Sequence, residues 1–360
     1  MAKLAVVTPY GLFNYGNRLQ NWAVTTSLRS RGFDPETLIL KAKYPGPVLR
    51  DLARLVVHSA NLRHLHSKRY RRFLEFDKSI NTRRIYSAQS VPGVLSEYVG
   101  TVIGSDQIWN PYQVDFDGAE FGIGAAAGSV VSLSASFGID SYPVERASAA
   151  SSYLSRIERI SVREESAQDI VRGLTGREVP VVIDPTLSLS ADIWRRRADY
   201  EFVPGHDYGF VYMLGKYAPV VRTAVDELIV DHSARTVRLY DLAAPGYFPA
   251  GPQDFVGLIA ESKLVVTDSY HAVIFGILFG KSVYLVERND KPYSMASRFE
   301  TLSSLLGVEF EEAREIGGVP CRRVLSSHVG DQLKQRRVEF EEFLDSALAG
   351  MRPRRSGDPR

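Results

Sequence analysis

The segment from Leu264 to Val286 constrains the fold of this chain more than any other. It contains an apolar run, Leu264–Thr267, then a polar turn, Asp268–His271, and then a second apolar run that Gly280 ends, Ala272–Phe279. These lengths predict a buried strand, a helix and, over Ser282–Val286, a second strand. In a strand–helix–strand unit, the turn after the first strand is where open α/β sheets bind ligands.

The polar turn of this unit has two interpretations. A helix N-terminus offers N–H groups without partners and the positive end of a dipole, which suits a phosphate or carboxylate. His271 at that point can hold or move a proton near neutral pH. In the alternative, Asp268 or Ser269 is only an N-cap and His271 is its neighbour. The turn alone does not decide between them.

The composition limits the class of protein. A length of 360 residues predicts about two domains, and 44% hydrophobic with 24% charged residues is typical of soluble globular proteins. The net charge of +2 argues against a nucleic-acid partner. The chain begins in a strand-like run without a signal peptide, its longest apolar run is too short to cross a bilayer, and its single Cys321 excludes a disulfide framework. We therefore expect a cytoplasmic protein. The seven histidines show no metal-binding spacing, so we expect no metal and no cofactor.

Strand and helix patterns alternate along the whole chain. Strands are predicted at 4–8, 36–40, 99–103, 130–134, 157–162, 179–183, 208–213, 236–240, 264–267 and 282–286. Helices are predicted at 18–29, 62–76, 143–155, 165–174, 219–231, 252–261, 272–279, 298–306 and 331–349. The alternation predicts an α/β fold, with a parallel sheet covered on both faces in the first part. We expect two Rossmann-like domains, residues 1–188 and 189–350, facing each other across a cleft in a glycosyltransferase-B-like layout, and a disordered tail at 351–360.

Two turns at strand ends carry side chains suited to a sugar. In Tyr10–Asn21, Asn17, Arg18 and Gln20 could hydrogen-bond hydroxyls; the alternative is a glycine-rich turn with ordinary caps. In Ile103–Pro111, the carboxylate of Asp106 could bind hydroxyls or act as an acid or base, with Gln107, Trp109 and Asn110 beside it. The alternative there is a capped turn with a packing tryptophan.

Three further turns complete the set. Ser134–Gly138 is a turn of small residues that permits close packing. In Ser161–Ser166, Arg163 stands where a fork-shaped donor could bind an anion, or could pair with a neighbouring glutamate. The Asp268–His271 turn is the fifth, with Arg298 nearby at the start of the next helix. Because all five follow successive strands, we expect them at one edge, around one ligand cleft.

The stretch from Arg50 to Arg84 is basic, with ten Lys or Arg and three Asp or Glu. It could lie on an anionic membrane surface, where each basic residue adds about 1 kcal/mol of attraction. The alternative, which we favour, is the solvated face of a helix that places Phe73 and Phe76 in the core.

Six segments together resemble the polysaccharide pyruvyl transferase family in order and spacing. They are Asn14–Asn21 (NYGNRLQN), Gly104–Pro111 (GSDQIWNP), Ser136–Gly138 (SFG), Ser161–Ser166 (SVREES), Asp184–Thr186 (DPT) and Thr267–Ala272 (TDSYHA). The similarity runs from about residue 5 to about residue 310, and GSDQIWNP is its most specific part.

The resemblance implies transfer of a pyruvyl group from phosphoenolpyruvate to sugar hydroxyls, as a cyclic ketal and without a metal. It implies a donor site around Asp106, Arg163 and the turn Asp268, Ser269, Tyr270 and His271. One difference stands out: some members have Arg-Leu-His where this chain has Ser269-Tyr270-His271. Arg298, Arg163 or Lys216 could replace that arginine as the partner of the donor's carboxylate. Ala272, where glycine is frequent, is a small change.

The chemistry of phosphoenolpyruvate indicates what such a site must supply. A general acid must protonate the methylene carbon, and a positioned acid contributes about 10²–10⁴-fold. His271 is the first candidate for this acid and Asp106 the second, while Arg163 and the helix start would stabilise the donor's charges. We expect the Asn17–Gln20 and Asp106–Asn110 loops to hold the acceptor, and the two domains to close during turnover.

The acceptor would be a polysaccharide, an oligosaccharide or a lipid-linked sugar. A nucleotide-sugar glycosyltransferase of the same architecture and a non-catalytic sugar-binding protein remain alternatives, because fold alone does not fix function.

Overall fold

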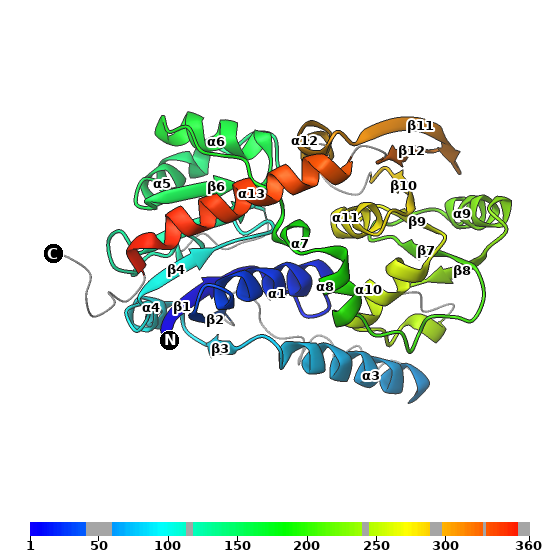
Figure 1. Cartoon of the computed structure of the whole chain (residues 1–360), viewed down its shortest axis with the longest axis horizontal. Helices are drawn as coiled ribbons and strands as arrows, with labels where there is room; N and C mark the ends of the chain where they lie inside the picture. The colour runs from blue at the N-terminus through cyan, green and yellow to red at the C-terminus, as the bar shows by residue number, and fades with distance from the viewer. Residues whose placement is uncertain (41–59, 113–117, 240–244, 289–296, 327–328, 352–360) are drawn as a thin grey trace.

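Two sheets, each covered by helices, form the framework of the computed structural model, which describes residues 1–40, 60–112, 118–239, 245–288, 297–326 and 329–351 (Figure 1). In Figure 1 the first sheet lies on the left and the second on the right. The carboxyl ends of strands from both sheets border one cavity between them. The predicted two-part α/β fold is therefore confirmed.

The first sheet is parallel throughout, with the strand order β3-β2-β1-β4-β5-β6. Its strands are β1 (Ala2–Val7), β2 (Phe33–Leu40), β3 (Thr82–Ile85), β4 (Gly100–Ile103), β5 (Val130–Ala135) and β6 (Arg159–Val162). β4 and β5 are buried along their whole length, which fits the lack of charged residues in both strands. The predicted strand at 179–183 is wrong: only Val181 forms an isolated bridge, to Val162.

Helices cover this sheet and lead out of it. They are α1 (Tyr15–Arg29), α3 (Ala60–Asp77), α4 (Val91–Leu95), α5 (Val144–Leu154), α6 (Glu165–Thr175), α7 (Pro185–Ser188) and α8 (Ala191–Arg197). α1 begins three residues before its predicted start, because Asn14 caps it by accepting a hydrogen bond from the N–H of Asn17 at 3.0 Å. This earlier start puts Gly16 and Asn17 in the first helical turn.

The second sheet is mixed, with the order β11-β12-β10-β9-β7-β8. Its strands are β7 (Tyr208–Tyr212), β8 (Arg235–Arg238), β9 (Leu264–Thr267), β10 (Ser282–Val286), β11 (Glu309–Ile316) and β12 (Val319–Leu325). Four of them are parallel, but β12 is antiparallel to β10 and to β11. The antiparallel strands β11 and β12 were not predicted from the sequence.

The helices of the second half are α9 (Pro219–Asp231), α10 (Pro252–Glu261), α11 (Tyr270–Leu278) and α12 (Ser297–Leu306). β9 and β10 have the predicted bounds. α11 begins at Tyr270, two residues before its predicted start, so Tyr270 and His271 belong to its first turn. Short 3-10 turns lie at Ala88–Ser90, Ala119–Phe121, Pro245–Tyr247 and Ala349–Met351.

The last helix, α13 (Val329–Leu348), runs along both halves (Figure 1). It packs on α12 and, further along, on α7 and β5. Near its end, Glu341 and Asp345 form ion pairs with Arg31 at the end of α1, at 2.5 and 3.0 Å. The domain limit after residue 188 stays a prediction. Met351 is buried, and the rest of the predicted tail lies outside the described residues.

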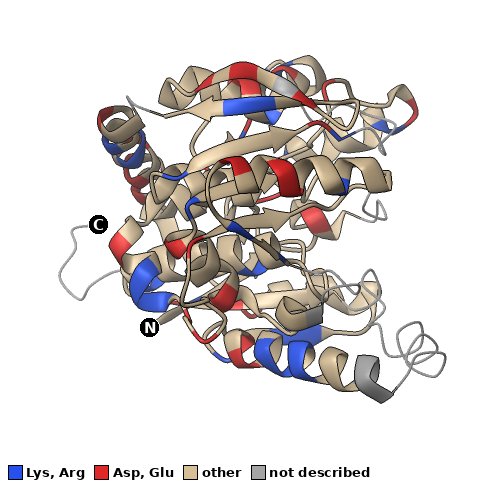
Figure 2. Cartoon of the chain, turned by 90° about the vertical axis from the view of Figure 1, so that its right-hand side faces the viewer, with Lys and Arg blue, Asp and Glu red and all other residues tan. Residues whose placement is uncertain are grey.

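Figure 2 shows several Lys and Arg positions along α3, the lowest helix in that view. Arg69, however, is buried, and Arg72 pairs with Asp254 at 2.8 Å. Lys68 and Arg71 remain exposed on this helix. The solvated-face interpretation therefore fits α3 better, while residues 50–59 of the basic stretch lie outside the described residues. None of the helices in the described ranges has the length and apolar content needed to cross a membrane.

Candidate functional site

A cavity of about 400 Å³ lies where the strand ends of the two sheets meet. Its volume is in the range of small-molecule sites. The first half contributes Pro9, Gly11, Asn14, Gly16, Asn17, Asp106 and Gln107. The second half contributes Tyr212, Leu214, Phe255, Asp268, Ser269, Tyr270, His271, Arg288 and Arg298.

Two helices begin at this cavity, one from each half. α1 brings Gly16 and Asn17, and α11 brings Tyr270 and His271. Ser269 is the N-cap of α11, but its side chain makes no capping hydrogen bond. Since a helix N-terminus attracts negative charge, the cavity is suited to an anionic ligand.

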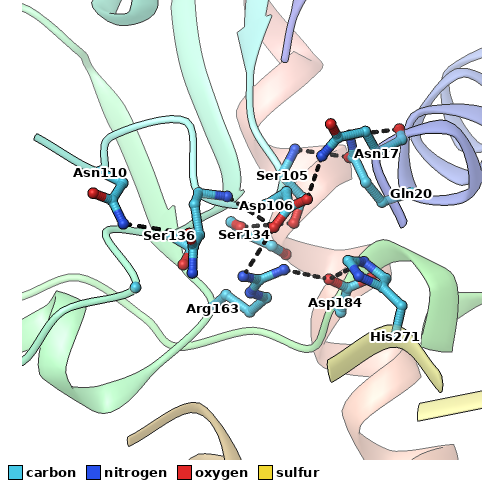
Figure 3. A network of polar contacts seen from close by, with 12 residues as sticks. Asn17, Gln20, Ser105, Asp106, Asn110, Ser134, Ser136, Arg163, Asp184 and His271 are labelled. Carbon is cyan, nitrogen blue, oxygen red and sulfur yellow. Dashed lines mark hydrogen bonds and ion pairs between the residues drawn. The ribbon is translucent and has the colours of Figure 1, made fainter. Parts of the chain in front are cut away.

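A chain of polar contacts joins the cavity residues Asn17 and His271 (Figure 3). Asn17 Nδ2 donates to Asp106 Oδ2 at 2.5 Å, and Asp106 Oδ1 lies 3.4 Å from Arg163 Nη2. Arg163 Nη1 donates to Asp184 Oδ2 at 2.9 Å, and that oxygen lies 3.7 Å from His271 Nε2. The chain links α1 of the first half to α11 of the second through buried charges.

These contacts set the charge states of Asp106 and His271. Burial alone would raise the pKa of Asp106, but the charges of Arg163 and Arg298 hold it below its usual value. Burial lowers the pKa of His271 below its usual value, although Asp184 and Asp106 favour the charged form. In the empty protein at neutral pH, Asp106 is therefore ionised and His271 is neutral.

The ring of Tyr270 contacts two guanidinium groups. The carbon of the Arg163 guanidinium lies 4.6 Å from the ring centroid, and that of Arg298 lies 5.4 Å from it. Arg298 is 7% exposed and lines the cavity, and its Nε has no hydrogen-bond partner among the described residues. Burial, with the nearby charge of Arg163, lowers the pKa of Arg298. An anion in the cavity would give the buried guanidinium of Arg298 a partner of opposite charge, and would offset both its burial and the repulsion from Arg163.

Asp268 has a structural function that the sequence did not indicate. Its carboxylate accepts hydrogen bonds from the N–H groups of Leu214 and Gly215, both at 2.7 Å, and from the hydroxyl of Tyr217 at 3.0 Å. These bonds fix the loop after β7 at the rim of the cavity. The carboxylate has little capacity left for a ligand, so its predicted donor-binding role is not supported.

Arg163 does not line the cavity and lies behind it. It is 2% exposed and neutralises Asp106 and Asp184; these two carboxylates and Glu164 outweigh burial and raise its pKa. Glu164 accepts hydrogen bonds from Ser136 Oγ and from the N–H groups of Phe137 and Gly138, at 2.8 to 3.0 Å. The third and fourth predicted turns thus hold each other and support the site from behind.

Trp109 is a core residue, which corrects its predicted role in sugar binding. It is fully buried, its ring stacks on Phe121 at 5.4 Å, and its Nε1 donates to the carbonyl of Glu120 at 2.9 Å. Asn110, also fully buried, bonds Gln107 and the N–H of Tyr112 within its own loop. Neither lines the cavity, because the loop turns their side chains inward after Asp106.

Arg18 and Gln20 also serve the fold and do not line the cavity. Arg18 Nε donates to Asp77 Oδ1 at 2.7 Å, and its guanidinium lies 3.5 Å over the ring of Tyr10. Gln20 is fully buried and accepts from the N–H of Ser105 at 3.1 Å, which supports the Asp106 loop. Among the predicted acceptor residues, Asn17 and Gln107 line the cavity.

Two site residues were missed by the sequence reasoning. Asp184 was noted only within a motif, yet it joins Arg163 to His271. Arg288 lines the cavity just after β10, and its position at a strand end was a usable signal. Within the described ranges, no cluster of His, Cys, Asp and Glu has the makings of a metal site.

Several solved structures align with nearly the whole chain, although their sequence identity to it is low. A protein assigned as a UDP-N-acetylglucosamine 2-epimerase from Listeria monocytogenes aligns with a TM-score of 0.51 at 10% identity, over 98% of this chain and 91% of that one. A glycosyltransferase from Rickettsia africae aligns with a TM-score of 0.45 at 11% identity, over 98% of this chain and 100% of that one. The first of these supports the glycosyltransferase-B-like fold.

A search of curated proteins gave no significant match. A sequence model of the family described as polysaccharide pyruvyl transferase matches residues 14–290, which include most cavity residues of both halves but not Pro9, Gly11 or Arg298. This match confirms the resemblance noted from the motifs: the chain belongs to the polysaccharide pyruvyl transferase family.

Proposed function

We propose that this protein transfers the pyruvyl group of phosphoenolpyruvate to two neighbouring hydroxyls of a sugar, in a polysaccharide, oligosaccharide or lipid-linked precursor. The product is a cyclic ketal, and phosphate is released. One observation carries the proposal: two helix N-termini and the guanidinium of Arg298 converge on a cavity beside His271. A titratable group beside an anion site is what protonation of this donor requires.

Arg298 takes the place of the arginine that other members have at Ser269. It lines the cavity, its Nε lacks a hydrogen-bond partner among the described residues, and the ring of Tyr270 holds its guanidinium. It binds one anionic group of the donor, while the N–H groups at the start of α11 bind the other. Arg163, behind the cavity, neutralises Asp106 and Asp184 and so reduces their repulsion of these anionic groups.

His271 supplies the proton for the methylene carbon of the donor. It is neutral in the empty site, but entry of a multiply charged anion favours the imidazolium and raises the pKa of His271. Asp106 does not act as the acid, since its pKa is held low. It accepts a proton from an attacking hydroxyl, in the same cavity and hydrogen-bonded to Asn17.

The overall reaction balances with these two groups. Protonation of the methylene carbon forms the methyl group, one hydroxyl adds to the neighbouring carbon, phosphate leaves, and the second hydroxyl closes the ketal. One hydroxyl proton ends in the methyl group and the other on phosphate, so His271 and Asp106 return to their starting states. Arg298 and helix N–H groups supply the positive charge, and the proposal includes no metal or other cofactor.

The acceptor binds on the side of the cavity that belongs to the first half. Asn17 and Gln107 offer amide groups there, beside the carboxylate of Asp106. We place the enzyme in the cytoplasm. We keep contact between residues 50–84 and the inner membrane face as a separate proposal, which binding to anionic lipid vesicles would test.

An assay with two readouts tests the proposed function. The protein, phosphoenolpyruvate and candidate glycans should together release phosphate and add the mass of a pyruvyl ketal to the glycan, in the presence of a strong chelator as in its absence. Release of a nucleotide from a nucleotide-sugar would instead assign a glycosyltransferase. Glycan binding with neither product would assign a sugar-binding protein. Turnover that a chelator stops and Mg²⁺ restores would contradict the metal-free mechanism.

A further inference from the structure

The two carboxylate oxygens of Asp184 have different partners. Oδ1 accepts hydrogen bonds from Thr186, from the N–H at 2.9 Å and from Oγ1 at 2.7 Å, and so caps the short helix α7. Oδ2 accepts from Arg163 at 2.9 Å and faces His271 Nε2 at 3.7 Å (Figure 3). The first oxygen serves the fold, and the second points at the proposed acid.

The ring of His271 turns its Nε2 edge toward Asp184 and packs a face against Gly16. Nε2 is buried and has no hydrogen-bond partner among the described residues. A Cβ added to Gly16 would lie 2.2 Å from Nδ1, 2.6 Å from Cε1 and 2.7 Å from Cγ, which places it over the face of the ring. Gly16 and His271 both line the cavity. Nδ1 has no hydrogen-bond partner among the described residues either, but unlike Nε2 it is not fully buried, so the Nδ1 edge is the one that borders the ligand space.

Electrostatics selects one tautomer for this orientation. If Nδ1 carried the proton, the lone pair of Nε2 would face the carboxylate of Asp184 and be repelled by it. If Nε2 carries the proton, its N–H points at a negative oxygen that already lies 3.7 Å away. Contacts of this kind are often long in empty sites and tighten when the ligand is bound.

We propose that Asp184 is a positioning residue that holds His271 as the Nε2–H tautomer, so that Nδ1 is the atom that exchanges protons in the cavity. Arg163 fixes Asp184 in turn, since its other terminal nitrogen is engaged by Asp106. The link to catalysis rests on the proposed role of His271, whereas the tautomer can be measured without a substrate.

Several charges act on His271 besides Asp184. Asp106 favours its charged form, Arg163 and Arg298 oppose it, and the ring of Tyr270 packs edge-on against it at 5.6 Å. Loss of the Asp184 carboxylate removes one of the two favourable charges. The Asp184→Asn variant should therefore lower the pKa of His271 further.

Nitrogen-15 NMR of the histidine rings in the full-length protein tests the orientation. The His271 signal is assigned by its loss in His271→Asn. In the wild type at neutral pH, Nε2 should carry the proton and Nδ1 should not; the reverse pattern would overturn the proposal without any further variant. In Asp184→Asn, the Nε2–H preference should weaken and the pKa should fall, and an unchanged His271 signal would also overturn it.

Thr186→Val is the matched control, because it removes the hydroxyl bond to Oδ1 and leaves Oδ2 in place. It should keep the wild-type tautomer and turnover. Asp184→Asn should lower kcat about 10- to 100-fold with little change in KM for phosphoenolpyruvate, as for other carboxylates that orient a histidine. Equal losses of kcat in Asp184→Asn and Thr186→Val would show that Asp184 acts only as the cap of α7. If the wild type shows the expected tautomer but transfers nothing from phosphoenolpyruvate, the proposed function fails and the orientation stands.

Discussion

Gly16 of the first half and His271 of the second touch across the cavity: a Cβ at position 16 would lie 2.2 Å from Nδ1 of the histidine. That separation is far below any ordinary contact between a Cβ and a nitrogen. The position of His271 thus depends on the absence of a side chain at the start of α1.

Gly16→Ala should move His271 and lower kcat about 100-fold, because a displacement of about 1 Å in a catalytic site has that order of effect. Steady-state kinetics measure it. Gly173→Ala in α6 is the control, since its Cβ would meet no atom within 4 Å. Turnover of Gly16→Ala equal to that of the control would show that the ring does not need this contact.

His271→Ala should remove turnover while the free energy of unfolding changes little, because the side chain sits at a polar helix start and fills no apolar core. His271→Asn separates two functions, since it can still donate a hydrogen bond but cannot act as an acid. Near-normal turnover in His271→Asn would leave the histidine with a binding role alone. Rates and thermal unfolding of both variants decide this.

Arg298→Gln should lower kcat/KM for phosphoenolpyruvate about 10- to 100-fold, because it removes a charge-assisted hydrogen bond worth about 1.5–3 kcal/mol. Arg196→Gln, on the exposed side of α8, is the control and should behave as the wild type. If kcat/KM is unchanged in Arg298→Gln, Arg298 does not bind the donor. Arg288, which also lines the cavity, then becomes the candidate for that role.

Trp109→Ala should lower the free energy of unfolding by about 3–5 kcal/mol, the usual effect of removing a large aromatic side chain from a core. Tyr112→Ala in the same loop should have a small effect, since Tyr112 is 60% exposed. Chemical denaturation measures both. A stable Trp109→Ala variant with a raised KM for the acceptor would restore the sugar-binding role.

Binding of phosphoenolpyruvate at neutral pH should take up protons. Burial holds the pKa of His271 below its usual value in the empty protein, so the ring is neutral there, and the bound anion raises that pKa and draws a proton from solution. Titration calorimetry in buffers of different ionisation enthalpy counts the protons. His271→Asn should show less uptake, and equal uptake in both proteins would assign the proton to another group.

The sequence was most informative where burial is complete. β9 and β10 have the predicted bounds, because an apolar run between polar turns leaves one arrangement for a buried strand. Asp106 and His271 were placed at one cavity, since both follow buried parallel strands. The hairpin of β11 and β12 was missed because charged residues alternate along β11, although Gly317 and Gly318 in its turn were a signal.

Side-chain direction could not be predicted in the same way. A strand end fixes where a loop begins, but the loop's own hydrogen bonds decide which side chains point into the cavity. Trp109 follows Asp106 by three residues and points into the core. Asp184 was overlooked for a related reason: its importance depends on Arg163 and His271, which are far away in the sequence.

The path of α13 has a mechanical consequence. The chain leaves the first half near α7 and α8 and returns through α13, whose Arg337 donates to the carbonyls of Leu187 and Leu189 at 2.7 and 2.8 Å. These hydrogen bonds fasten the outgoing and returning segments side by side. Because the N-cap of α7 is Asp184, whose Oδ2 lies 3.7 Å from His271 Nε2, this fastening sits beside the cavity and braces the wall that carries the histidine.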